Sequence, residues 1–349
     1  MIQSLRCLLL TLLILLLSSP SLKAFQVENA EESKDIPIDV VGKVQDHHYL
    51  NVAGYHLSLP RIIFVEGSYI PYWFWSTEEA VESGMFTEDP NHNLVPAEGV
   101  GPVTLDMSIT SHLMYVWFGV GLTFLLTIAM ARRYRKGVGR ETEPKGWFHN
   151  LFEITFVFVR DDIAKNNIPD DKYRKFVPYL FGVFVAITFM NLFGLFPWGV
   201  TATADITVTG VLAAITFFLT QWNGSKDHWE HVFWFPGVPP LMRIILTPIE
   251  IIGLFTKPLA LAVRLFANML SGKIMIICIL GLIFIFTEFF GSIVGIGSTI
   301  LVVPLTVALY LLKAFVGILQ AYIFTLLSAV FIGMAAEEHH HEEGVEMHA

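Results

Sequence analysis

The apolar residues of this chain gather in long uncharged stretches that alternate with polar segments. Residues 108–131 contain no Asp, Glu, Lys or Arg, and similar stretches cover about residues 176–196 and 206–222. Two more segments, 241–290 and 298–336, are mainly apolar but include a few charged residues, and they are much longer than the roughly 20 residues that one helical crossing of a bilayer needs. The pattern predicts an all-α integral membrane protein with five membrane crossings, of which the last two are long tilted helices.

Three segments between the crossings carry further predictions. The sequence GWFHNLFEITFVFVRDDI (146–163) spaces its apolar residues as an amphipathic helix lying on the membrane surface would. Residues 223–240 are polar and aromatic and are expected to form an inner loop, and Gly291–Gly297 is expected to turn the chain between the two long helices. His228 and His231 suit a metal site or an interfacial position, and their spacing beside Trp residues favours the second.

Charge sets the expected orientation in the membrane. Only 15% of the residues are charged, against about 25% in soluble domains, which argues against an ordinary soluble enzyme. Residues 132–176 hold 11 of the 22 Lys and Arg residues, and cytoplasmic loops collect such cations. We therefore expect a multi-pass protein of a bacterial inner (plasma) membrane, with its N-terminus periplasmic and its C-terminus cytoplasmic.

The expected domains are a signal peptide (1–24), an acidic periplasmic extension (25–107), a membrane domain (108–336) and a cytoplasmic tail (337–349). The apolar core of the first segment has about 11 residues, which suits a cleaved signal better than a retained anchor. The extension has three cations and fourteen acids, and short strands are plausible at 47–59 and 61–67. Its Trp73–Trp75 run fits either the lipid interface or a small core.

Charged residues inside the last two apolar segments are candidates for function, because they are costly in a bilayer. At 100° per residue, Arg264 shares a helix face with Asn268 and with Ser271, whereas Lys273 points to the opposite side. On the last helix, one stripe contains Lys313, Gly317, Gln320 and Phe324. Three explanations remain open for these groups: two helices that satisfy each other's polar groups, an ion path, or a substrate pocket.

Two sequences carry a resemblance to a known family, namely KPLALAVRLFANMLSGK (257–273) and LQAYIFTLLSAVFIGMAAEEH (319–339). MNLFGLFP (190–197) and TADITVT (203–209) add weaker support. Over about residues 104–340 the chain resembles the a subunit of F-type ATP synthases, the membrane stator that faces a rotating ring of c subunits. The resemblance leaves the outer extension unexplained.

The resemblance implies a non-catalytic, ion-translocating subunit with no cofactor or metal of its own. Its implied partners are the c-subunit ring, the b-subunit peripheral stalk, the rest of the complex and membrane lipid, with no nucleic acid. Arg264 matches the arginine that separates two proton half-channels, and Gln320 matches the glutamine opposite it. Asn268 matches a residue of the outer half-channel and Glu250 an acid of the inner one. Asp205 matches an acid near the outer end of the third crossing, where a helix cap is an equally good explanation.

The chain departs from the family pattern at two positions. Lys273 and Lys313 stand where family members carry an acid or a histidine, often as a complementary pair. Two neighbouring cations repel each other, so the pKa of at least one of them is expected to fall, which would allow a proton relay. The alternatives are that they pair with Glu288, with a ring acid or with each other through water, or that they simply snorkel or pair locally. This departure bears on the outer half-channel.

The sequence leaves alternatives to a proton-conducting stator. The same machine could carry Na⁺ in place of H⁺. A membrane metalloenzyme is disfavoured because no HExxH motif occurs, and no GxxxxGK[ST] phosphate-binding loop is found either. A secondary transporter often shows two repeated halves, which the sequence lacks.

Overall fold

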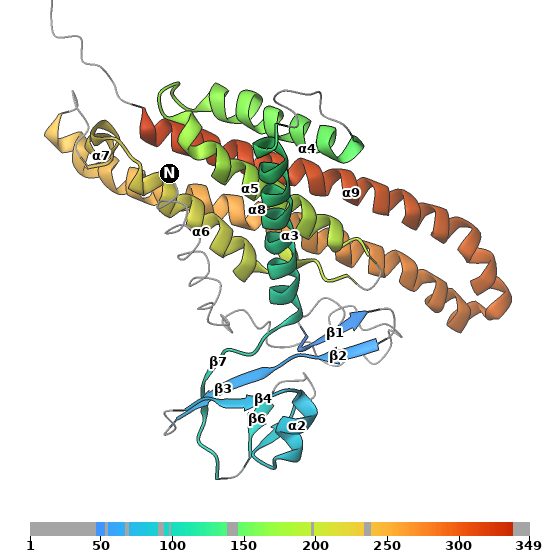
Figure 1. The fold of residues 1–349 in the computed structure, drawn as a ribbon. Helices are drawn as coiled ribbons and strands as arrows, with labels where there is room; N and C mark the ends of the chain where they lie inside the picture. The colour runs from blue at the N-terminus through green and yellow to red at the C-terminus, as the bar shows by residue number, and fades with distance from the viewer. Residues whose placement is uncertain are drawn as a thin grey trace, which may run out of the picture. The chain divides into compact units, whose positions relative to one another are not determined.

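The computed structural model describes residues 47–52, 55–66, 70–89, 94–97, 99–137, 146–196, 199–233 and 239–337 (Figure 1). The predicted signal peptide and the predicted tail beyond Glu337 lie outside these residues. By its internal contacts the chain divides into two compact units. One comprises residues 1–122, 187–211 and 264–319, and the other comprises residues 123–186, 212–263 and 320–349.

Helices dominate the part of the chain after residue 110. Four are long and apolar enough to cross a membrane: α3 (Ser111–Arg135), α5 (Tyr173–Phe193), α8 (Pro240–Phe290) and α9 (Ser292–Ala336). A fifth crossing arises if α6 (Ile206–Trp222) and α7 (Lys226–Phe233), which meet at 105°, form one broken span. The described residues thus form a largely helical, multi-pass membrane protein, as the sequence predicted.

The first unit begins with a small β-rich domain. Its strands form three antiparallel sheets, β1-β2, β4-β3-β7 and β5-β6. Their bounds are β1 (Tyr49–Val52), β2 (Tyr55–Ser58), β3 (Arg61–Val65), β4 (Tyr72–Phe74), β5 (Phe86–Glu88), β6 (Leu94–Pro96) and β7 (Val103–Asp106), and helix α2 (Thr77–Glu82) follows β4. The predicted short strands at 47–59 and 61–67 are confirmed.

A compact apolar core holds this domain together. It contains Ile63, Val65, Phe74, Ala80, Phe86 and Leu94, and Phe74 meets Phe86 edge to face. Arg61 is also fully buried. Burial lowers the pKa of its guanidinium below the ordinary value, and the nearby Asp106 and Glu88 oppose that shift. The Trp73–Trp75 run is split by strand alternation: Phe74 enters the core, whereas Trp73 and Trp75 are exposed.

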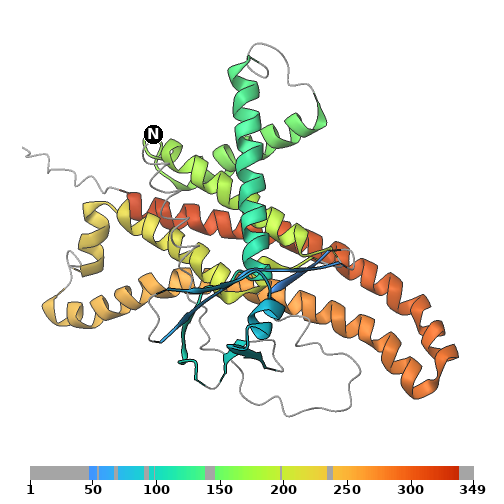
Figure 2. The same cartoon turned by 60° about the horizontal axis from the view of Figure 1, so that its bottom comes forward.

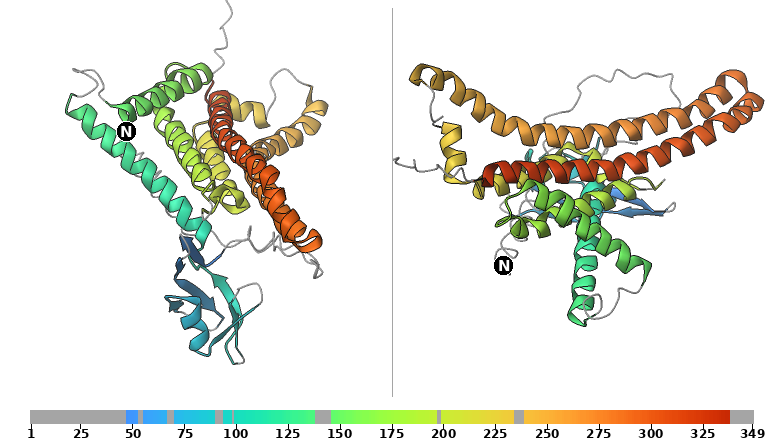
Figure 3. Two further views of the ribbon diagram at one scale, coloured as in Figure 1. Left: turned by 90° about the vertical axis from the view of Figure 1, so that its right-hand side faces the viewer. Right: turned by 90° about the horizontal axis from the view of Figure 1, so that it is seen from above.

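In the same unit, the second half of α8 and the first half of α9 run antiparallel as a helical hairpin (Figures 2 and 3). Gly291 alone joins them, with φ at 84°, a conformation that favours glycine. The predicted turn over Gly291–Gly297, with a helix starting at 298, is therefore wrong. Gly295 lies inside α9, where a Cβ atom would collide with Thr287 of α8. That glycine permits close helix packing and does not mark a loop.

The second unit contains α4 (Trp147–Val157), continued by a π-helical segment, η2 (Phe158–Lys165). Phe152 and Phe156 both pack edge to face on Phe181 of α5. The predicted amphipathic helix over 146–163 is therefore confirmed as a helix with one packed side. Residues 223–240, predicted as a loop, contain α7 instead. Ser225 ties the start of α7 to the end of α9, since its N–H donates to Ala335 O (2.7 Å) and its hydroxyl to Glu337 O (2.8 Å).

Candidate functional site

Arg264 lies within the longest apolar helix, α8, and its side chain is exposed. Leu261, Leu265 and Met269 are buried on one side of this helix, and Asn268 is exposed one turn after the arginine. Within the part of the chain that the structure describes, Arg264 makes no hydrogen bond and no ion pair. The guanidinium is therefore presented on the surface of an apolar helix.

Lys273 of α8 and Lys313 of α9 act on each other electrostatically in the first unit. Lys313 is buried, and its aliphatic chain packs on Gly272, where a Cβ atom would lie 3.4 Å from the lysine Cε. The helical hairpin therefore holds two cations close together in an apolar setting. Of the roles expected for these lysines, snorkelling is a poor fit for Lys313, because its side chain is buried.

A buried polar cluster joins three parts of the first unit. The Asn191 amide donates to Gly317 O of α9 at 2.8 Å and accepts from the hydroxyl of Thr203 at 2.5 Å. Thr203 belongs to the short 3-10 helix η3 (Ala202–Ala204). Asn191 and Thr203 were not singled out in the sequence. Two features of the sequence could have pointed to them. A polar residue in an apolar crossing needs a hydrogen-bond partner, and both residues lie in the segments 190–197 and 203–209 that give weaker support to the family resemblance.

Asp205, Ser271 and Glu288 occupy more ordinary positions. Asp205 caps α6, because its Oδ1 accepts from the N–H of Thr207 at 2.6 Å. The hydroxyl of Ser271 donates to Asn268 O at 3.4 Å in its own helix. Glu288 is exposed in the last turn of α8, about 22 Å along the helix from Lys273 at 1.5 Å per residue. The suggested pairing of Glu288 with Lys273 is therefore wrong.

Helix length also separates Glu288 from the other lysine. Lys313 lies 22 residues beyond Gly291 on α9, about 33 Å from the turn, whereas Glu288 lies three residues before it. The hairpin therefore keeps this acid away from Lys313 as well.

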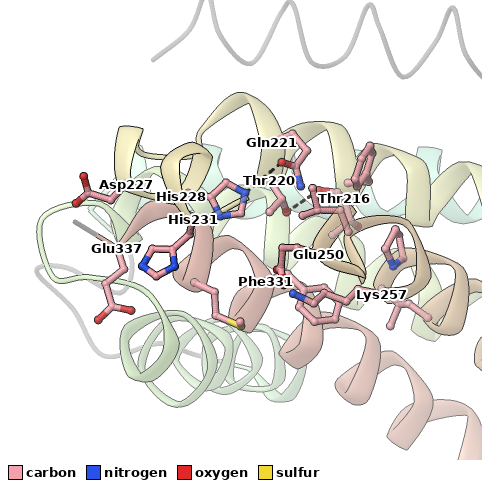
Figure 4. A pocket seen from close by; sticks show the side chains of 15 residues that line it. Thr216, Thr220, Gln221, Asp227, His228, His231, Glu250, Lys257, Phe331 and Glu337 are labelled. Atoms are coloured by element: carbon pink, nitrogen blue, oxygen red, sulfur yellow. Dashed lines mark hydrogen bonds between the residues drawn. The ribbon is translucent and has the colours of Figure 1, made fainter. Parts of the chain in front are cut away.

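The second unit contains a cavity of about 310 Å³ between α6, α7, α8 and the end of α9 (Figure 4). Glu250 and Lys257 line it from α8, and His228 and His231 line it from α7. The remaining polar residues of the lining are Thr216, Thr220, Gln221, Asp227 and Glu337. Sequence reasoning selected Glu250 but treated the two histidines as interfacial.

The cavity lining offers groups that can bind and pass protons. The ring Nε2 of His228 lies 3.2 Å from Oε1 of Gln221, which orients the imidazole in the lining. A carboxylate, two imidazoles and hydroxyl groups in one cavity can exchange protons through intervening water. No group of three or more His, Cys, Asp or Glu residues within the described ranges is arranged to hold a metal ion.

The predicted stripe on α9 is buried along its length. Lys313, Gly317, Gln320 and Phe324 are all buried, with Gln320 only 1% exposed. This confirms the face of the helix that the sequence assigned to the interior. Gln320 therefore places an amide, which donates and accepts hydrogen bonds without acting as a base, inside the protein.

Comparison with known proteins supplies the family. A family model described as ATP synthase A chain matches residues 113–333. The chain is 43% identical to ATP synthase subunit a of Chloroherpeton thalassium, over 70% of this chain and 71% of that protein. It is 40% identical to ATP synthase subunit a of Myxococcus xanthus, over 68% of this chain and 77% of that protein.

A third relative reaches further toward the N-terminus. ATP synthase subunit a of an Anaeromyxobacter species is 36% identical, over 87% of this chain and 72% of that protein. Residues 108–349 are 242 of 349, or 69% of the chain, so this match includes part of the segment 25–107 that precedes the membrane helices. From the matched membrane helices and these relatives, we conclude that the chain belongs to the ATP synthase A chain family, the a subunits of ATP synthase.

Proposed function

We propose that this chain is the stator subunit of a rotary ATP synthase and that Arg264 separates two proton half-channels. The observation that carries the proposal is the exposed Arg264 on an apolar helix, with no ionic partner among the described residues. A guanidinium in a bilayer is costly unless it is paired, so its partner belongs to another chain. The carboxylates of a c-subunit ring have the required chemistry.

The proposed role of Arg264 follows from its permanent charge. A fixed cation attracts a deprotonated ring carboxylate and holds it ionised until the ring turns. The same cation repels a proton that would cross directly from one half-channel to the other. Lysine could lose its proton in such a setting, whereas arginine does not. Gln320 is proposed to support the site by hydrogen bonding without taking up a proton.

The inner half-channel is proposed to be the cavity around Glu250. Protons leaving the ring would pass Glu250 and reach the cytoplasm by way of His228 and His231. The support is that one cavity gathers these three titratable side chains. Lys257, in the same lining, would discourage other cations from entering.

The outer half-channel is proposed to involve Asn268, Ser271, Lys273 and Lys313, with Asp205 and Glu288 nearer its entrance. The support for a relay through both lysines is geometric: the Lys313 side chain packs on Gly272, the residue that precedes Lys273 on α8. The cap of α6 uses Oδ1 of Asp205, and the other carboxylate oxygen is proposed to take up protons at the entrance.

We further propose that residues 1–24 are a cleaved signal and 25–107 a periplasmic extension, before the membrane domain (108–336) and the cytoplasmic tail (337–349). The protein would lie in a bacterial inner membrane, bound to the c ring and to the b-subunit stalk. It performs no bond chemistry itself, since the catalytic head of such a machine consists of other chains.

The test is ATP-driven proton uptake by inverted membrane vesicles, comparing wild type with Arg264→Gln after equal assembly of the complex is confirmed. We expect the variant to lose pumping. Normal pumping by the variant would contradict the proposed role of Arg264. If wild-type vesicles pump Na⁺ and not protons, the stator role holds and the ion is the alternative one.

A further inference from the structure

We propose that the outer β-rich domain of this chain rests on the lipid headgroup region of the outer leaflet through Trp73 and Trp75. The proposal rests on the geometry of the first unit and on the membrane crossing of α3. It does not depend on the ion path.

Trp73 and Trp75 form an exposed aromatic pair. Their exposed fractions are 53% and 69%, and their rings meet edge to face with centroids 5.8 Å apart. Phe74 between them is buried, so both indoles stand on the face of the strand opposite the domain core. An isolated exposed apolar residue needs no explanation, but two adjacent indoles form one continuous exposed aromatic patch.

The backbone around the pair is fixed. The N–H of Trp75 donates to the Glu79 carboxylate at 2.7 Å, and the Ser76 hydroxyl accepts from the Glu79 N–H at 3.0 Å. Together these bonds form a cap at the start of α2. The indoles are therefore presented by a rigid segment, which reduces the entropy lost on binding.

The domain is also fixed to the outer end of α3. Ser111 N donates to His47 O at 2.8 Å, Ile109 N to Pro60 O at 3.1 Å, and Met107 N to Ile62 O at 2.9 Å. Every second residue from Met107 to Ser111 is thus hydrogen-bonded to the backbone of the β-rich domain. These bonds tie the connection between β7 and α3 to the domain up to the first residue of the helix.

Strand register brings the tryptophans to the end of the sheet nearest α3. Trp73 is opposite Ile62 and Phe74 is opposite Arg61, so Trp75 is level with Pro60. Pro60 in turn is bonded to Ile109, two residues before α3 begins. Two strand spacings place Trp75 about 10 Å from this connection.

The length of α3 puts that point near the bilayer surface. Its 25 residues span about 37 Å, more than the roughly 30 Å hydrocarbon core, so its first turn reaches the headgroups. Tryptophan is enriched at this depth, where its ring is sheltered and its N–H reaches water. Lipid headgroups are therefore the occupant that the position favours.

Charge decides which lipid surface fits. Among the described residues of 47–107, Arg61 is the sole cation, and it is buried. Glu78 and Glu79 lie beside the pair at the start of α2. The described residues of this domain therefore offer no exposed Lys or Arg to anionic lipid, and we expect contact with zwitterionic headgroups that added salt does not weaken.

The experiment uses the assembled complex in phosphatidylcholine vesicles, with Cys278, the cysteine outside the proposed signal peptide, replaced by serine. A fluorophore is attached to Trp73→Cys or Trp75→Cys, and to Val95→Cys of β6 as a matched exposed control, 45% exposed in the wild type. Lipids with a spin label near the headgroup should quench positions 73 and 75 roughly twofold or more beyond position 95. Equal quenching at all three positions would overturn the proposal.

A second readout separates lipid from protein as the covering partner. Shielding of positions 73 and 75 from aqueous iodide without quenching by lipid would mean that a protein covers them, and would also overturn the proposal. A label-free check uses the wild-type tryptophan emission minus that of the Trp73→Phe, Trp75→Phe double variant. Brominated phosphatidylcholine should quench this difference signal, and an unquenched signal would contradict lipid contact.

Discussion

The side-chain amide of Asn191 in α5 donates a hydrogen bond to the backbone carbonyl of Gly317 in α9, at 2.8 Å. Gly317 allows this approach, because a Cβ atom there would lie 3.2 Å from Asn191 Cβ. Four residues before Gly317 on the same buried stripe is Lys313. The bond therefore fixes the helix turn that carries one of the candidate proton carriers.

Removing this amide should destabilise the protein. Asn191→Ala leaves the buried Thr203 hydroxyl without its acceptor, which should cost about 1–3 kcal/mol. The measurement is the thermal unfolding midpoint of the purified protein in detergent. Asn166→Ala is the matched control: its exposed amide bonds only to Asp162 O in its own helix, at 3.1 Å. An equal effect of both changes would show that the buried bond contributes nothing special.

Arg264→Lys should preserve assembly but uncouple transport. A lysine can lose its proton in an apolar site, so the barrier between the proposed half-channels becomes leaky. We expect weaker ATP-driven pumping and faster passive proton flux once the catalytic head is stripped from the vesicles. Full coupling in this variant would show that any cation suffices at the position.

Glu250→Gln should slow transport without blocking assembly, because the amide keeps the shape of the side chain but cannot carry a proton. We expect a roughly tenfold slower proton uptake. His228→Gln should slow it less, since Glu250 and His231 remain in the cavity. Ile252→Val, an exposed change on the same helix outside the lining, serves as the control. Wild-type rates in both cavity variants would contradict the proposed inner path.

Lys273→Glu should be milder than any change at Arg264. It replaces repulsion of Lys313 by attraction, so the hairpin should become more resistant to heat while pumping is altered but retained. Thermal unfolding and proton uptake are to be measured on the same preparation. A silent substitution in both assays would be hard to reconcile with a relay through Lys273.

Much of the helical framework was predictable because a bilayer imposes simple demands. A crossing needs a long, predominantly apolar stretch, and an amphipathic surface helix needs apolar residues at helical spacing. The buried stripe from Lys313 to Phe324 followed from the same 100° periodicity. The turn at Gly291–Gly297 was mispredicted because glycine serves both turns and close helix packing, and sequence does not distinguish Gly291 from Gly295.

The sequence by itself determined the membrane class, the multi-pass helical architecture and the selection of Arg264, since a lone guanidinium among apolar residues stands out in any arrangement. Only the tertiary structure decided which polar groups meet. It paired Asn191 with Gly317, gathered His228 with Glu250 in one cavity and separated Glu288 from both lysines. The reason is physical: periodicity fixes the face on which a side chain lies, whereas its partner depends on how separate helices pack together.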